Sequence, residues 1–115
     1  MKYIPVQNYI NGKFIDATSA STLDVISPLD GTLLSKVPMS TAKDLDNAVK
    51  AAKTAFSAWS HTPIKERVQV FFRYKYLIEK NLKELAELCS EENGKTIGEA
   101  TAEIEKCIEL TEFAC

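Results

Sequence analysis

Residues 92–99 read ENGKTIGE, and the centre of this stretch is Gly94-Lys95-Thr96. Gly-Lys-Thr ends the phosphate-binding loop of nucleotide hydrolases, in which backbone N–H groups, the lysine and the hydroxyl hold phosphate and Mg²⁺. That loop requires a glycine five residues before Gly94, and this position is Cys89. It also follows a strand, whereas residues 82–90 have a helical pattern of apolar residues. The stretch therefore predicts a boundary between two helices and not a phosphate site.

Two further patterns could carry chemistry. Tyr76 and Lys80 have the Tyr-x-x-x-Lys spacing of short-chain dehydrogenases, in which the lysine lowers the pKa of the tyrosine. Those enzymes also need a glycine-rich turn after an N-terminal strand, and this sequence has none. His61 is the only histidine, which excludes a metal site built from several histidines, and its place between two helices indicates a loop surface residue rather than the base of a Ser-His-Asp triad. We interpret these residues as helix and loop surface.

The cysteines and the acidic pair Glu91-Glu92 also lack a reactive context. Cys89, Cys107 and Cys115 are odd in number and have no C-x-x-C spacing, so we expect reduced thiols. None has a nearby histidine or glycine-rich turn to activate it. Adjacent helical carboxylates point about 100° apart and do not converge on one substrate. The residues themselves thus predict no catalytic, cofactor-binding or metal-ligating group in this chain.

Composition indicates a globular protein. The 115 residues fit one ordinary domain, with 45% apolar and 26% charged residues. The net charge of −2 offers no basic surplus for nucleic acid or an anionic membrane. No apolar run approaches the roughly 20 residues of a membrane span, and the N-terminus lacks the pattern of a signal or transit peptide. We therefore expect a cytoplasmic protein that binds neither nucleic acid nor a membrane.

The first 39 residues predict two β-hairpins. Asn11-Gly12 lies between two short apolar segments and tolerates the positive φ angles of a type I′ turn. A second pair of strands, at residues 23–26 and 32–37, is joined by Ser27-Pro28-Leu29-Asp30-Gly31. Proline presets φ for that turn and Asp-Gly closes it.

From Ser40 the apolar period changes to that of helices. Thr41 and Asp44 predict the cap of a first helix. Thr62 as N-cap and Pro63 as first helical residue predict the start of a second, which should end near Lys80. The apolar face of the first helix comprises Leu45, Ala48, Val49, Ala52, Ala55, Phe56 and Trp59.

Asn81 with Glu84 predicts a third helix, which Asn93-Gly94 should end in a left-handed conformation. Thr96 with Glu99 forms a capping box for a fourth helix. One stripe of that helix is apolar, and its last residues are apolar in nearly every direction, which is typical of a buried helix interrupted part-way. The stripe is Ile97, Ala100, Ile104 and Ile108, and the end is Leu110, Phe113, Ala114 and Cys115. We expect the isolated chain to cover this end by self-association, or by packing its helices differently from those of a complete protein.

The predicted fold class is α+β, with N-terminal β-hairpins followed by about four helices. We assign residues 1–39 to a β-hairpin segment and residues 40–115 to a helical part, truncated at the C-terminus. The order of these pieces resembles the N-terminal part of the NAD-dependent aldehyde dehydrogenases and of their larger α/β fold. The matching segments, in chain order, are Tyr9–Phe14, Ser27–Gly31, Asp44–Trp59, Pro63 with Arg67, Leu82–Ala86 and Glu92–Lys95.

Within that family, residues 92–96, Ile108-Glu109 and residues 112–115 are most similar to the methylmalonate-semialdehyde dehydrogenases, which acylate coenzyme A. The resemblance implies NAD and coenzyme A as cofactors of the full-length enzyme. Neither is expected to bind this chain, because the family's catalytic cysteine, glutamate base, oxyanion-binding asparagine and glycine-rich turn have no match here. The resemblance thus gives the residues present a role in the scaffold of the cofactor domain, inactive alone.

One departure concerns the substrate. Lys106-Cys107 stands where the subfamily usually has Arg-Gly. That arginine faces the aldehyde entrance, where it can hold a substrate carboxylate, so the resemblance makes Lys106 a substrate-binding candidate. A lysine would offer a point charge in place of a planar fork. Another carboxylated aldehyde, such as succinate semialdehyde, remains an alternative substrate, and a stand-alone helical interaction module remains an alternative function.

Overall fold

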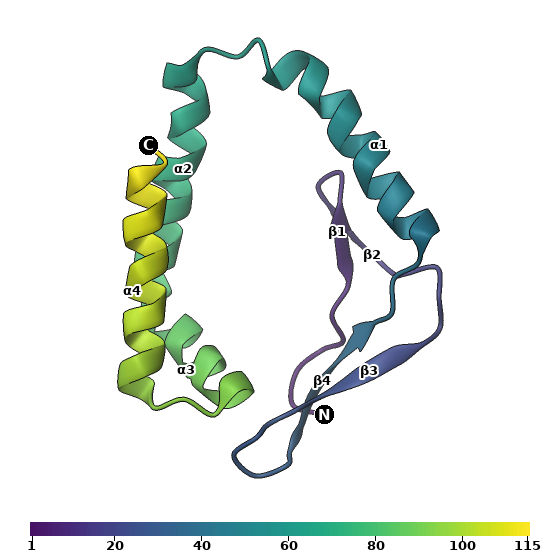
Figure 1. The fold of residues 1–115 in the computed structure, drawn as a ribbon, viewed down its shortest axis with the longest axis vertical. Helices are drawn as coiled ribbons and strands as arrows, with labels where there is room; N and C mark the ends of the chain where they lie inside the picture. The colour runs from purple at the N-terminus through teal and green to yellow at the C-terminus, as the bar shows by residue number, and fades with distance from the viewer. The chain divides into compact units, whose positions relative to one another are not determined.

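The computed structural model describes residues 1–115 as two β-hairpins followed by four helices, which confirms the α+β prediction (Figure 1). The strands are β1 (Asn8–Ile10), β2 (Lys13–Ile15), β3 (Thr22–Ile26) and β4 (Leu33–Pro38). The helices are α1 (Ala42–Trp59), α2 (Ile64–Lys80), α3 (Leu82–Asn93) and α4 (Ile97–Phe113). The chain forms two compact units. The first contains residues 1–26 and 31–61, and the second contains residues 27–30 and 62–115.

The first hairpin has the predicted turn. β1 and β2 pair antiparallel, with Tyr9 opposite Phe14. Asn11 and Gly12 have φ angles of 52° and 75°, the two positive values that a type I′ turn requires. The rings of Tyr9 and Phe14 lie with their centroids 4.9 Å apart, a cross-strand aromatic contact that supports this register.

The second hairpin is covered along one edge by the N-terminal segment. β3 and β4 pair antiparallel, with an irregularity between Val25 and Ile26. On the other side of β4, the N–H of Tyr3 donates to the carbonyl of Leu34 at 2.8 Å, and the N–H of Val6 donates to that of Lys36 at 2.9 Å. These bonds satisfy backbone groups that an edge strand would otherwise present to another chain.

Asp44 joins helix α1 to the loop that precedes β3. Thr41 is the N-cap of α1, and its N–H and hydroxyl donate to the Asp44 carboxylate at 2.7 and 2.8 Å. The N–H and hydroxyl of Thr18 donate to the same carboxylate at 3.0 and 2.9 Å. The side chain of Asp44 is buried. The predicted cap is confirmed, and it also fixes a loop 26 residues away in the sequence.

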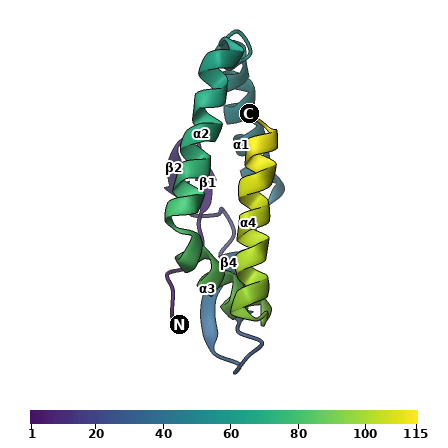
Figure 2. The ribbon, with the colours of Figure 1, turned by 90° about the vertical axis from the view of Figure 1, so that its left-hand side faces the viewer.

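The second unit is a set of three helices (Figure 2). α2 and α4 lie side by side, and α3 packs mainly on α4. The buried apolar side chains are Ile78, Ala86 and Ala100, one from each helix. Lys75 on α2 forms ion pairs with Glu79 at 2.7 Å and with Glu112 on α4 at 3.0 Å. The hydrogen bond from Lys75 to Glu79, and then that to Glu112, raises the pKa of this lysine.

The starts of α2 and α3 differ in detail from those predicted from the sequence. α2 begins at Ile64, so Pro63, and not Thr62, occupies the N-cap position. Asn81 is the N-cap of α3 as expected, but its side chain makes no bond to that helix. The amide nitrogen of Asn81 instead donates to the carbonyl of Leu77 at 2.7 Å. The same carbonyl also accepts the backbone N–H of Asn81 at 3.1 Å, so the side chain adds a second hydrogen bond at the end of α2.

Gly94 ends α3 in the predicted left-handed conformation, with φ of 70°. Its N–H donates to the carbonyl of Ser90 at 2.8 Å, and the hydroxyl of Ser90 donates to the carbonyl of Lys95 at 2.7 Å. A Cβ atom on Gly94 would lie 3.0 Å from Cγ of Pro28, in the turn that belongs to the same unit. Both the backbone angle and the close approach thus require glycine here.

Gly94→Ala is expected to lower the free energy of unfolding by roughly 1–2 kcal/mol, because an L-residue is strained in the left-handed region. The contact with Pro28 adds to this cost. Gly98→Ala is the matched control: Gly98 lies in α4, and a Cβ atom added there would have no neighbour within 4 Å. That variant should be more stable by roughly 0.5–1 kcal/mol, because alanine favours helix. Urea unfolding monitored by circular dichroism measures the free energy of unfolding of both variants. Equal changes in the two variants would contradict the conclusion that the backbone at position 94 requires glycine.

Asp44→Asn is expected to destabilise the first unit and to flatten its acid unfolding. The N–H of Thr41, with further hydrogen bonds from Thr41 and Thr18, lowers the pKa of Asp44 from 3.8 to about 2, against the effect of burial. The stability that this carboxylate contributes is therefore complete above pH 3.8 and is lost as the pH falls towards about 2.

Thermal unfolding of the wild type and of Asp44→Asn between these pH values measures this contribution. The exposed Asp46→Asn on the same helix is the control, and it should keep the wild-type pH dependence. An Asp44→Asn variant that still loses stability as steeply as the wild type would show that another group causes the acid transition.

Candidate functional site

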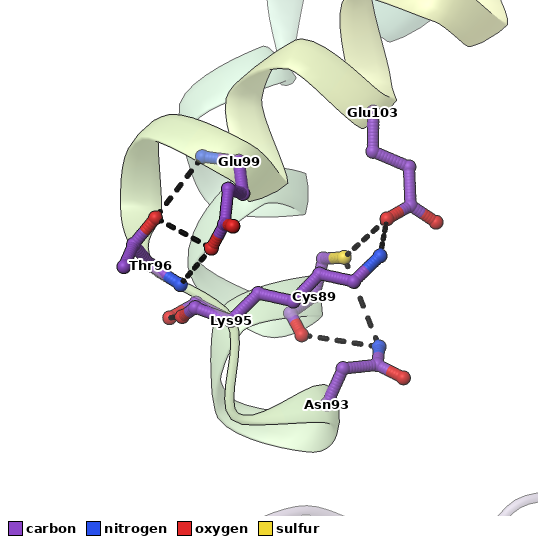
Figure 3. Close-up of polar contacts among 7 residues, drawn as sticks. Cys89, Asn93, Lys95, Thr96, Glu99 and Glu103 are labelled. Carbon is purple, nitrogen blue, oxygen red and sulfur yellow. Dashed lines mark hydrogen bonds and ion pairs between the residues drawn. The ribbon is translucent and has the colours of Figure 1, made fainter.

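The Gly-Lys-Thr stretch lies between α3 and α4, where Thr96 begins α4 (Figure 3). The N–H and hydroxyl of Thr96 donate to Oε2 of Glu99 at 3.0 and 2.8 Å, and the N–H of Glu99 donates back to the hydroxyl at 3.3 Å. The hydroxyl of Thr96, followed by its N–H, lowers the pKa of Glu99. The predicted capping box is confirmed. The groups that would hold phosphate or Mg²⁺ in a phosphate loop are thus used to start a helix.

Lys95 is also occupied. Its ammonium forms an ion pair with Oε2 of Glu103 on α4, and this pair raises the pKa of Lys95 and lowers that of Glu103. The thiol of Cys89 on α3 contacts the same oxygen at 3.7 Å, and Nδ2 of Asn93 donates to the carbonyl of Cys89 at 3.1 Å (Figure 3). Lys95 therefore lies along α4 and not over a phosphate cradle. The residues of this junction do not fit a nucleotide phosphate.

The contact between Cys89 and Glu103 was not predicted. The two residues are 14 positions apart and belong to different helices, so neither spacing nor periodicity could bring them together. The only sequence signal was the tight Gly94 turn, which forces α3 and α4 to lie against each other.

Lys106 lies on the exposed side of α4, with 66% of its side chain accessible. Its ammonium forms an ion pair with Glu109, one turn further along the helix. The apolar residues Leu110 and Phe113, which continue the same side of the helix, are also exposed. Residues 1–115 thus leave this apolar helix end uncovered, and its self-association stays a prediction.

The remaining candidates do not converge on one another. Cys107 and Cys115 are exposed thiols. Nδ1 of His61 lies 2.8 Å from the carbonyl of Ser57 on α1, so this ring stays at the helix end. No group of three or more His, Cys, Asp and Glu side chains in residues 1–115 is placed to hold a metal ion. None of the helices has the length and apolar character of a membrane span.

An open cavity of about 430 Å³ lies in the first unit, between β1 and the start of α1. Asp44 is its only charged lining residue, and both carboxylate oxygens already accept hydrogen bonds from Thr18 and Thr41. The other polar side chains there belong to Asn8, Tyr9, Ser40 and Thr41, and the hydroxyl of Ser40 donates a hydrogen bond to Oδ1 of Asn8 at 3.0 Å. The cavity therefore has no side chain arranged for acid–base or nucleophilic chemistry.

The decisive observation comes from comparison with known proteins. The model of the aldehyde dehydrogenase family matches residues 14–115. The chain belongs to this family. It is 46% identical over 109 residues to malonate-semialdehyde dehydrogenase 1 from Geobacillus thermodenitrificans, and 44% identical to malonate-semialdehyde dehydrogenase from Bacillus pumilus. Each match covers 95% of this chain and 22% of the relative.

Solved structures agree on the fold. A candidate methylmalonate-semialdehyde dehydrogenase from Sinorhizobium meliloti, in complex with NAD, superposes with a TM-score of 0.91 and 34% identity. The match covers 98% of this chain and 23% of that one. A 3,6-anhydro-L-galactose dehydrogenase gives a TM-score of 0.93 with 32% identity, over 96% of this chain and 23% of that one. The chain thus has a fold found within these dehydrogenases and spans about a quarter or less of their length.

Proposed function

We propose that this chain is the N-terminal part of an NAD-dependent dehydrogenase that oxidises malonate semialdehyde or methylmalonate semialdehyde. The observation that carries the proposal is the 46% identity over 109 residues to a malonate-semialdehyde dehydrogenase. NAD as cofactor is supported by the related Sinorhizobium meliloti structure, which contains it. Coenzyme A as acyl acceptor is inferred from the subfamily that residues 92–96 and 112–115 resemble.

In this proposal the role of residues 1–115 is structural. The polar groups that could do chemistry are instead engaged in caps and ion pairs, such as Thr96 with Glu99 and Lys95 with Glu103. In this proposal the chain alone supplies neither a nucleophile nor a cofactor site. It would position the first helices of the cofactor domain.

The proposal predicts that the chain is inactive alone and active when completed. The test protein is a fusion of residues 1–115 to the part of the Geobacillus thermodenitrificans enzyme that lies beyond its 109 matched residues. With malonate semialdehyde, NAD and coenzyme A, the fusion should form NADH and the isolated chain should not. NADH formation by the chain alone, or a folded fusion that oxidises only uncharged aldehydes, would contradict the proposal. Preference for succinate semialdehyde would support the alternative substrate.

We also propose that Lys106 selects carboxylated aldehydes in the completed enzyme. Its ammonium is exposed and pairs with Glu109, which a substrate carboxylate could replace. Lys106→Ala in the fusion should lower kcat/KM for a semialdehyde acid by roughly ten- to a hundred-fold, the value of one hydrogen bond between charged groups. The kcat/KM for an uncharged aldehyde of equal length should fall much less.

Lys106→Arg is the matched variant, because it keeps the charge and adds a planar fork. It should retain or improve the selectivity for the acid. If Lys106→Ala lowers kcat/KM equally for both substrates and Lys106→Arg does not restore it, Lys106 has a structural role.

A further inference from the structure

Helix α1 has three distinct faces. Successive residues turn by about 100° around an α-helix, so the helix can be divided by position. The first face, formed by Asp44 and small residues, lies beside the first hairpin: Ala48, Ala51 and Ala55 line a groove there with Tyr9 and Ile10 of β1, and Ala52 borders the same groove. This is the face that the first unit uses for its own packing.

The second face carries the large apolar side chains. Leu45, Val49, Ala52, Phe56 and Trp59 follow at intervals of three or four residues, which places all five within about 40° of one line along the helix. We name these five residues the α1 stripe. The centre of the α1 stripe is rotated about the helix axis by about 90° from the centre of the face that lies beside β1. The exposed fractions of its four large members are 65% for Leu45, 50% for Val49, 66% for Phe56 and 43% for Trp59.

The third face is polar and includes Lys43, Asp46, Asn47, Lys50, Lys53 and Ser57. The helix thus separates an exposed apolar side from an exposed polar side over its 18 residues. Such separation is typical of a helix with one face towards solvent and one against a protein core. Single apolar residues on a surface need no explanation, but a continuous row of this length does.

We propose that the α1 stripe is a docking surface for the remaining part of an aldehyde dehydrogenase polypeptide. The inference rests on the proposed function, since it takes the partner from there. Chain length favours this partner, because the match covers only 22% of each relative and most of its length lies outside the matched part. The same fold with a TM-score of 0.91 occurs inside a structure of which it forms 23%. The rest of such a polypeptide can supply a large apolar surface for the stripe.

Trp59 provides a direct readout, because it is the only tryptophan of the chain and belongs to the stripe. The chain labelled with 5-fluorotryptophan should give one ¹⁹F resonance, which a soluble nitroxide should broaden strongly. In the labelled fusion described above, the resonance that disappears with Trp59→Phe identifies the same side chain. The proposal predicts that this resonance is protected from the nitroxide in the fusion.

Two results would overturn the proposal. A Trp59 resonance that is broadened equally in the chain and in a fusion that oxidises malonate semialdehyde would show an open stripe, while the proposed function would stand. Protection of Trp59 already in the isolated chain would show that a second copy or another part of this chain covers the stripe. A fusion that protects Trp59 but oxidises no semialdehyde would leave the docking surface standing and reject the substrate.

Charged substitutions separate docking from packing within the chain. Val49→Lys and Phe56→Lys lie on the stripe, and their controls Asn47→Lys and Ser57→Lys place the same charge on the polar face of the same helix. All four should leave the thermal unfolding midpoint of the isolated chain within a degree or two of the wild type. In the fusion, the stripe variants alone should abolish most of the soluble, active protein. A marked loss of stability in the isolated Val49→Lys chain would overturn the proposal even if no fusion is soluble.

Discussion

The carboxylate of Asp44 is the interaction on which the first unit depends. It accepts hydrogen bonds from the backbone and hydroxyl groups of Thr18 and Thr41, so one side chain closes the start of α1 and holds the loop before β3. Without it, the N–H groups of Thr18 and Thr41 would lose their shared acceptor, and the start of α1 would lose its cap. The hairpins and the helix are otherwise connected by few contacts. A local cap thus acts here as a tertiary connection.

The second unit depends on the same kind of constraint. Gly94 and Thr96 turn the chain between α3 and α4 by backbone conformation and capping, and this turn lets the two helices pack on each other and bury Ala86 and Ala100. Four apolar side chains are buried in the whole chain, and no large side chain is completely buried. Caps, turns and ion pairs therefore define the local structure, while the hydrophobic contribution from within these 115 residues is small.

This division explains which predictions from the sequence were confirmed. Asn11-Gly12, Thr41 with Asp44, Gly94, and Thr96 with Glu99 are local signals, since each acts within about four residues through backbone geometry. The structure confirms all of them. The role of Asn81 was less predictable, because the same amide can cap the helix behind it or the helix ahead, and only the observed backbone decides. The Cys89–Glu103 contact is tertiary and had no sequence signal.

Burial was the property that sequence could not give. The apolar period of α1 correctly predicted a helix with one apolar face. In this chain the large residues of that face are exposed, whereas its alanines line a groove with β1. A hydrophobic pattern identifies the face of a helix that favours burial. It does not identify the segment that covers this face. The Gly-Lys-Thr stretch shows the converse case, in which three residues typical of a phosphate site serve only to end one helix and begin the next. The spacing of residues identifies helices and turns reliably. Tertiary contacts decide whether an apolar helix face is part of a core and whether a lysine binds a ligand.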